Sequence, residues 1–356
     1  PIINEPGSGV RAINATGSIF ATFNSAYTID SSWEWKKWND KHNAYHFVTE
    51  NRDKTHGDDA SASFILALND QGNVAGGYSN KTFMIQVPTI WKWQSGKWSE
   101  PIELPYDESS EETSKGEMRG LNGSGTQAVG NINVLPNRRV QHYESDYNTN
   151  ASVWTEENGN WSLMRLSSET SSANAVNNKG DIVAGYDTVS AGGNYIATIW
   201  RFDGTTWSSM MIDDKRHYSE VFALNNAGDV AGGSTHYRPA IWSGNNYQKT
   251  ELKGVDGNIT QGEVRALSAD GKIAGGKSKV GENYRATIWS GNDWKAYDLG
   301  TFKKDGVGNS LVTAMNDDGT IVGGEATFED GESYAALWFI QYDENNKPTI
   351  DLLTNE

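Results

Sequence analysis

The residues best suited to chemistry lie in two short stretches of the sequence, 217–218 and 236–238. They are His217, Tyr218, His236, Tyr237 and Arg238. In an elimination on an acidic polysaccharide, a cation neutralises the uronate carboxylate and lowers the pKa of the α-proton, which a histidine or tyrosine removes. These five residues are therefore the candidate catalytic residues if the two stretches converge. Arg238 shares its place in an internal repeat with Arg285, which favours a structural role for it.

A second candidate site lies in segment 27–46, which is rich in tryptophan. Its candidate ligand-binding residues are Trp33, Trp35, Trp38 and His42. Exposed indole rings suit sugar rings or partner surfaces, although a loop that folds back and buries its own tryptophans explains them as well. His42 and His46 have the spacing of a helical metal pair, but His46 falls in an expected strand and no third ligand is evident, so no metal is predicted.

A third candidate site lies between residues 122 and 154. Its candidate ligand-binding residues are Arg138, Arg139, His142 and Tyr143. The two arginines place positive charge on an acidic protein and suit a carboxylate or sulfate. A solvated loop is the alternative.

Composition excludes several classes of function. The 356-residue chain has a formal net charge of −16 and no cysteine, which argues against nucleic-acid binding and removes disulfides, thiolate metal sites and cysteine nucleophiles. No apolar run is long enough for a membrane span. The first thirty residues lack the basic region followed by an apolar region that is typical of a signal peptide. No phosphate loop, dinucleotide fingerprint or Gly-x-Ser-x-Gly motif is present, so no cofactor is predicted.

These sites must be positioned by a repeat that runs along the whole chain. Each copy reads Ala-Leu-Asn-x-x-Gly, a short β-branched run ending in glycine, a variable stretch, and then Ala-x-Ile-Trp. The anchor residues are Asn14, Asn69, Asn122, Asn177, Asn225, Ser268 and Asn316. A period in this range is typical of propeller blades.

The fourth copy shows how one repeat becomes one blade. We expect strands at 172–176, 181–186, 195–202 and 205–212. Asn177 begins a turn by bonding its own backbone, and Gly180 accepts a positive φ. The Ala-Gly-Gly glycines should mark close approach of the next blade, and the repeated tryptophans should fill the layers between blades.

The predicted fold is an all-β, seven-bladed propeller of four-stranded antiparallel blades, forming a single domain over residues 1–356. The expected blades span approximately 9–55, 62–105, 116–166, 172–213, 219–253, 263–300 and 310–354. The ring should close by packing of 10–14 against 311–316. The loops between second and third strands and the crossovers between blades emerge at one end, so all three candidate sites should lie there.

The repeated sequence resembles the HAF-type extracellular repeat. The resemblance rests on Ala-Leu-Asn-x-x-Gly-x-x-Ala-Gly-Gly, on Ala-x-x-Trp, and on Tyr-Asp-Leu-Gly at 297–300. The first copy departs most, with Gly-Ser-Ile-Phe-Ala-Thr at 17–22 and Phe47 in place of tryptophan. The resemblance implies a β-propeller exported from a bacterial cell, extracellular or at the cell surface, and it brings no catalytic motif.

Two functions from different classes follow. The first is an extracellular, non-catalytic binding or adhesion module that recognises a polysaccharide or a cell-surface partner. The alternative is a lyase or hydrolase of an acidic polysaccharide that uses the His217–Arg238 cluster. A purely structural surface protein is a third interpretation.

Overall fold

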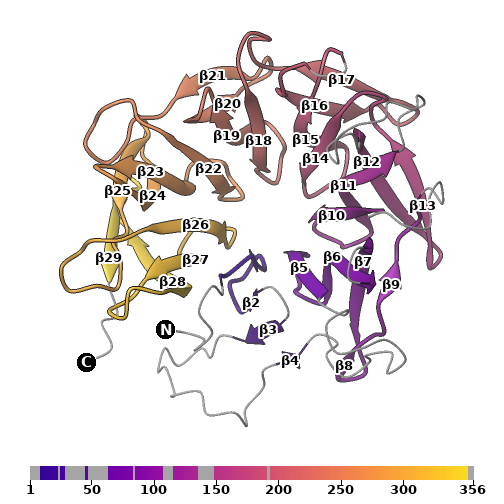
Figure 1. Cartoon of the computed structure of the whole chain (residues 1–356), viewed down its shortest axis with the longest axis horizontal. Helices are drawn as coiled ribbons and strands as arrows, with labels where there is room; N and C mark the ends of the chain where they lie inside the picture. The colour runs from indigo at the N-terminus through magenta and orange to yellow at the C-terminus, as the bar shows by residue number, and fades with distance from the viewer. Residues whose placement is uncertain are drawn as a thin grey trace.

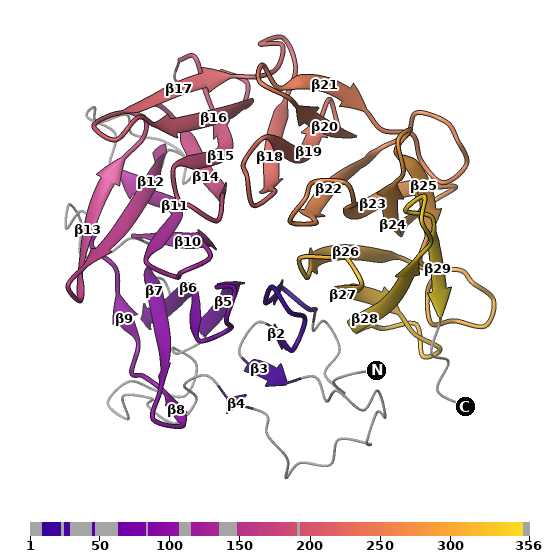
Figure 2. The same cartoon turned by 180° about the vertical axis from the view of Figure 1, so that it is seen from behind.

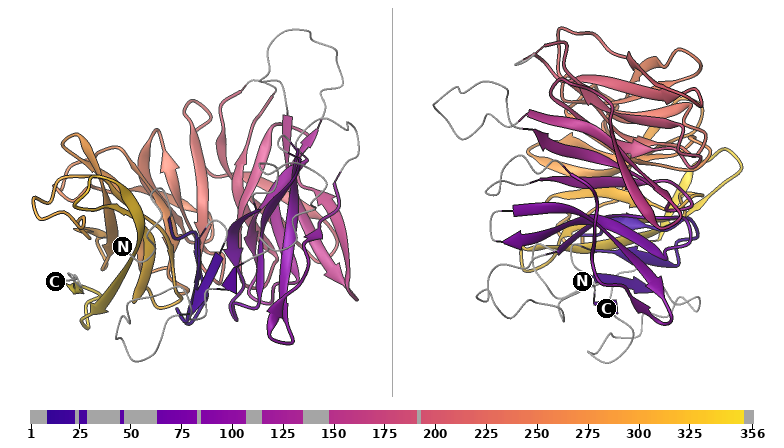
Figure 3. Two further views of the ribbon diagram at one scale, coloured as in Figure 1. Left: turned by 60° about the horizontal axis from the view of Figure 1, so that its bottom comes forward. Right: turned by 90° about the vertical axis from the view of Figure 1, so that its right-hand side faces the viewer.

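The structure is a computed structural model, and it describes residues 9–22, 25–28, 45–46, 63–82, 85–106, 115–134, 148–190 and 193–351. The sheets stand side by side around a central axis, each with its first strand innermost (Figures 1 and 2). The view from the side shows the strands running between the two ends of this ring (Figure 3). The molecule is an all-β propeller.

Most of the repeats form blades of four antiparallel strands. The first repeat has β1 (Ala12–Ile13), β2 (Ile19–Ala21), β3 (Ser25–Thr28) and β4 (Tyr45–His46). The third has β10 (Gly116–Leu121), β11 (Gln127–Val134), β12 (Asn148–Glu157) and β13 (Asn160–Arg165). The fourth has β14 (Ser171–Val176), β15 (Ile182–Asp187), β16 (Ile196–Phe202) and β17 (Trp207–Met211), within two residues of the predicted bounds.

The last three repeats follow the same order. The fifth has β18 (Ser219–Leu224), β19 (Val230–Thr235), β20 (Arg238–Ser243) and β21 (Gln248–Glu251). The sixth has β22 (Gly262–Leu267), β23 (Ala274–Val280), β24 (Asn283–Ser290) and β25 (Lys295–Asp298). The seventh has β26 (Ser310–Met315), β27 (Ile321–Thr327), β28 (Ser333–Tyr342) and β29 (Pro348–Asp351).

The expectation of seven four-stranded blades is wrong. Among the described residues six blades have four strands, whereas the second repeat forms a five-stranded sheet. Its strands are β5 (Ser63–Leu68), β6 (Val74–Thr82), β7 (Ile85–Gln94), β8 (Lys97–Trp98) and β9 (Ile102–Glu103). Both β8 and β9 pair with β7, because the outermost strand is interrupted near Pro101, which has no N–H to donate to a ladder.

The anchor asparagines and turn glycines act as predicted. Asn177 Oδ1 accepts the Ile182 N–H at 2.9 Å and the Gly180 N–H at 3.0 Å, and Gly180 has a φ of 85°. The repeated tryptophans are buried, as predicted for residues that fill the layers between blades. They are Trp91, Trp154, Trp200, Trp242, Trp289 and Trp338.

The Ala-Gly-Gly glycines allow two different close approaches. A Cβ on Gly232 would lie 2.6 Å from Val264 of the next blade, which confirms the predicted contact between blades. A Cβ on Gly233 would lie 2.0 Å from the carbonyl oxygen of Glu220 in its own blade, beside a break in register between Val221 and Ala223. Neither position has room for a side chain.

The blades are joined around the axis by backbone hydrogen bonds between successive anchor turns. The residue after each anchor donates its N–H to the carbonyl of its counterpart in the next repeat, at 2.7–3.3 Å, and Asp317 returns the series to Ala15. The residues of this turn girdle are Ala15, Asp70, Gly123, Asn178, Asn226, Ala269 and Asp317. The predicted closure is confirmed, since Val10 and Ile13 pack with Ala314, and the Val10 N–H donates to the Gly324 carbonyl at 3.0 Å.

The two ends of the propeller differ. At the turn end lie the anchor turns. At the loop end the second strand of each blade leads to the third, and each blade leads to the next. Among the described residues, no helix is long and apolar enough to cross a membrane.

Candidate functional site

The loop end carries a row of tyrosines that crosses from the fourth blade to the fifth. We name this set the tyrosine row: Tyr186, Tyr195, Tyr218 and Tyr237. Successive ring centroids are 4.2, 5.7 and 6.5 Å apart, the first pair being stacked and the second edge-on. Beside the row, the rings of His217 and His236 stack at 4.3 Å with an interplanar angle of 9°. The two predicted stretches therefore do converge.

The backbone holds this row in place. The carbonyl of Tyr195 accepts the Ser219 N–H at 2.9 Å, that of Tyr218 accepts the His236 N–H at 2.8 Å, and that of Tyr237 accepts the Gly262 N–H at 2.9 Å. These bonds connect neighbouring elements and neighbouring blades, so the exposed rings stand on a fixed frame.

His236 and Tyr237 form the two-residue turn between β19 and β20. Both have positive φ, at 51° and 62°. Turns with two positive φ values usually contain asparagine and glycine, because other side chains are strained there. The corresponding turn of the sixth blade contains Gly281, with a φ of 58°. The fifth blade therefore keeps two large rings at a position where smaller residues would be more stable.

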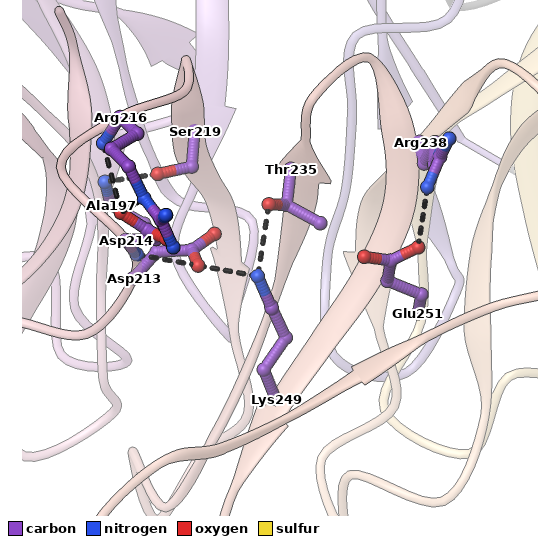
Figure 4. Close-up of polar contacts among 9 residues, drawn as sticks. All are labelled: Ala197, Asp213, Asp214, Arg216, Ser219, Thr235, Arg238, Lys249 and Glu251. Carbon is purple, nitrogen blue, oxygen red and sulfur yellow. Dashed lines mark hydrogen bonds and ion pairs between the residues drawn. The ribbon is translucent and has the colours of Figure 1, made fainter.

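Arg238 is not directed to the histidine pair. Its Nη1 lies 3.1 Å from Glu251 Oε2 on β21, an ion pair drawn in Figure 4. Arg285 bonds Asp298 at the matching positions of the sixth blade, at 3.3 Å. Both arginines thus connect the third strand of a blade to the fourth. Four of the five candidate catalytic residues therefore lie together. The fifth, Arg238, forms an ion pair that recurs at the same positions of the sixth blade.

The other candidate ligand-binding residues lie outside the described residues. These are Trp33, Trp35, Trp38, His42, Arg138, Arg139, His142 and Tyr143. Their binding roles stay predictions. The expected place of the first loop between second and third strands is wrong, because its residues follow β3 and precede β4 in the chain.

A polar pocket of about 200 Å³ opens at the loop end beside the tyrosine row. Its lining includes Gln86, Glu117, Arg119, Asn133, Thr149 and Tyr186. Glu117 accepts a hydrogen bond from Arg119 Nε at 2.7 Å, so the two charges compensate each other. Burial raises the pKa of Tyr186 to about 12, which keeps its hydroxyl protonated at neutral pH. Tyr186 joins the pocket to the row, because it lines the first and stacks in the second.

Charged side chains also occur on the strands of the fifth and sixth blades. Burial raises the pKa of Glu220, which accepts a bond from Asn174 Nδ2 at 2.8 Å. Burial would also raise the pKa of Glu263, but the ion pairs with Arg265 at 2.9 Å and Lys277 at 3.1 Å outweigh it and lower the pKa. These inner carboxylates therefore already have polar partners within the protein.

The cavity on the axis of the propeller is lined mostly by apolar residues, unlike the polar pocket at the loop end. This cavity of about 230 Å³ is lined mainly by alanine and leucine side chains of the inner strands, together with the polar side chains of Arg265 and Thr313. In the part of the chain that the structure describes, no three histidine, cysteine or acidic side chains are grouped as a metal site requires.

Sequence reasoning missed Tyr186, Tyr195 and the pocket. Tyr186 ends a second strand, and Tyr195 begins the segment expected as a third, so neither stands out from a strand pattern. Glu117 and Arg119 take the positions that Phe64 and Leu66 hold in β5. Because Glu263 and Arg265 take the same positions in β22, this pattern alone does not single out the pocket.

Comparison with known proteins supports the fold alone. No family model and no curated protein matches the chain. An oligogalacturonate lyase from Vibrio parahaemolyticus is similar in structure, with a TM-score of 0.55 at 9% identity over 98% of this chain and 93% of that one. TolB from Acinetobacter baumannii gives a TM-score of 0.44 at 10% identity, and the match covers 81% of this chain but only 64% of TolB. The likeness to the lyase supports the propeller fold, and the predicted HAF-type resemblance stays a prediction.

Proposed function

We propose that this protein is an extracellular, non-catalytic propeller that binds carbohydrate through the tyrosine row. The observation that carries the proposal is the contact between exposed rings across two blades. Tyr195, Tyr218 and Tyr237 are 38%, 47% and 62% exposed. The location outside the cell rests on the repeat resemblance.

The row combines exposure with fixed geometry. Aromatic faces bind the apolar faces of sugar rings, and tyrosine hydroxyls add hydrogen bonds at the edge. The main-chain bonds to Tyr195, Tyr218 and Tyr237 reduce the entropy lost on binding, since rings that are already ordered need no further ordering. The strained turn at Tyr237 is consistent with a ring retained for function.

A lyase acting on an acidic polysaccharide remains the alternative. The stacked pair of His217 and His236 beside Tyr218 favours it, because these groups can accept a proton. Arg238 weakens it, because the required cation is bonded to Glu251.

The test is isothermal titration calorimetry with neutral hexasaccharides such as cellohexaose, maltohexaose and mannohexaose. At least one should bind, and Tyr218→Ala should weaken that binding about tenfold, which corresponds to about 1.4 kcal/mol. Phe202→Ala is the matched control, because Phe202 is 37% exposed at the far end of β16. It should leave the affinity unchanged.

Binding that is unaffected by Tyr218→Ala, or absent for every oligosaccharide including acidic ones, would overturn the proposal. Incubation with polygalacturonate tests the alternative. Ultraviolet absorbance from unsaturated uronate that disappears in His236→Ala would establish a lyase and refute the non-catalytic assignment.

A further inference from the structure

The polar pocket next to Tyr186 bears on which glycans the row can bind. It lies between the second, third and fourth repeats, with Gln86 at the start of β7, Asn133 near the end of β11 and Tyr186 near the end of β15. Its position places it at one end of the tyrosine row.

The size of the pocket limits what it can hold. Sites for drug-sized ligands have volumes of about 300–1,000 Å³, and this pocket has about 200 Å³. It has room for one sugar ring rather than for two. A glycan lying along the row would therefore place a single residue here.

The lining suits hydroxyl groups. The amides of Gln86 and Asn133 and the hydroxyl of Thr149 offer both donors and acceptors. The Glu117–Arg119 pair adds a carboxylate acceptor and guanidinium donors side by side. Paired donors and acceptors of this kind match the adjacent hydroxyls of a sugar.

The charge of the lining opposes an acidic ring. Of the lining residues that the structure describes, Arg119 alone is cationic, and Glu117 compensates it. Glu220 lies close enough to Arg119 for Arg119 to act on its pKa, and the whole chain carries a net charge of −16. Among the described residues that line the pocket, a uronate carboxylate would meet no uncompensated cation, and it would lose its hydration.

From these observations we propose that the pocket binds one uncharged sugar residue and so selects neutral over acidic glycans. This inference rests on the proposed function of the row and adds the class of ligand. The tyrosine row outside the pocket stacks on sugar rings and distinguishes one sugar from another only weakly. The pocket distinguishes neutral from acidic sugar residues by their charge.

The test compares the neutral hexasaccharide that binds with hexagalacturonate by calorimetry, on the intact chain. The wild type should bind the neutral sugar at least tenfold more tightly. Glu117→Gln keeps the shape of the side chain and leaves Arg119 without its ion-pair partner, so the preference should shift toward hexagalacturonate by about tenfold. A gain in affinity cannot result from misfolding.

Glu157→Gln is the matched control, because it makes the same charge change at the exposed end of β12, at the turn end. It should not alter the preference. Tighter binding of hexagalacturonate by the wild type, or equal shifts in both variants, would overturn the inference while leaving the row as the binding site. Binding of no hexasaccharide at all would instead refute the proposed function.

Discussion

At the scale of single residues, the turn end places two aspartates near each other on the axis. Asp317 and Asp70 belong to the turn girdle, and Asn226 Nδ2 donates to Asp317 Oδ2 at 3.3 Å. Burial, together with repulsion from Asp70, raises the pKa of Asp317. The carboxyl of Asp317 therefore binds a proton more tightly in the folded protein than in the unfolded chain. Protonation of Asp317 stabilises the fold, and this stabilisation is lost as the pH rises through the raised pKa.

We predict that Asp317→Asn raises the melting temperature at pH 7 by about 1–2 °C, which corresponds to less than about 1 kcal/mol. The asparagine keeps an acceptor for Asn226 and removes the repulsion. The gain should disappear below about pH 4, where the wild-type carboxyl is protonated. Scanning calorimetry at both pH values measures it.

Asp318→Asn is the comparison, since Asp318 is the next residue of the same turn and accepts bonds from Thr320. Asp318 repels Asp317 more weakly than Asp70 does, and its substitution disturbs the bonds to Thr320, so it should give a smaller gain. A lower melting temperature for Asp317→Asn at neutral pH would show that the charge of Asp317 is favourable and would contradict this account.

At the scale of elements, the turn between β19 and β20 combines strain with exposed rings. Replacing His236 and Tyr237 by Asn-Gly gives the sequence that such turns prefer. We predict that this double variant is more stable by about 1 kcal/mol, or about 2–4 °C, because asparagine and glycine adopt positive φ with less strain than histidine and tyrosine. It should also bind the hexasaccharide at least tenfold more weakly.

Gly281→Ala changes the matching turn of the sixth blade in the opposite direction. It should lower the melting temperature, because Gly281 has a φ of 58°, and it should leave binding unchanged. A double variant that is stabilised and still binds fully would separate the strained turn from function and remove Tyr237 from the site.

The elements also show what the sequence alone can predict. The anchor asparagine and turn glycine of each repeat act locally, so strands such as β14 and β15 were predicted within two residues. The division of the outer strand of the second repeat was missed, because the break at Pro101 depends on how β8 and β9 pair with β7. The location of His217 and His236 at the same end of the propeller was predicted, since both flank one end of one blade, and the structure shows that their rings stack.

The remaining parts of the site were not predictable from residue patterns. Tyr186 and Tyr195 belong to the fourth blade, and Tyr218 belongs to the fifth. Their contact depends on how closely two blades pack. The pairing of Arg238 with Glu251 likewise required the register of β20 against β21. The sequence located one cluster, and the packing between blades extended it into a row.

At the scale of the whole molecule, the row depends on a ring that keeps its blades in fixed relation. The turn girdle links successive repeats at one end, and Val10 packs against the last blade to close the circle. Main-chain bonds from Ser219 to Tyr195 and from Gly262 to Tyr237 link adjacent blades at the other end. A binding surface that spans two blades is stable only in such a frame.

The most direct test of the central claim is a crystal structure of the protein with the hexasaccharide that binds most tightly. We predict sugar rings over Tyr195, Tyr218 and Tyr237, with one uncharged residue in the pocket beside Tyr186. Sugar bound at the turn end, or at the loop end away from these tyrosines, would contradict the account.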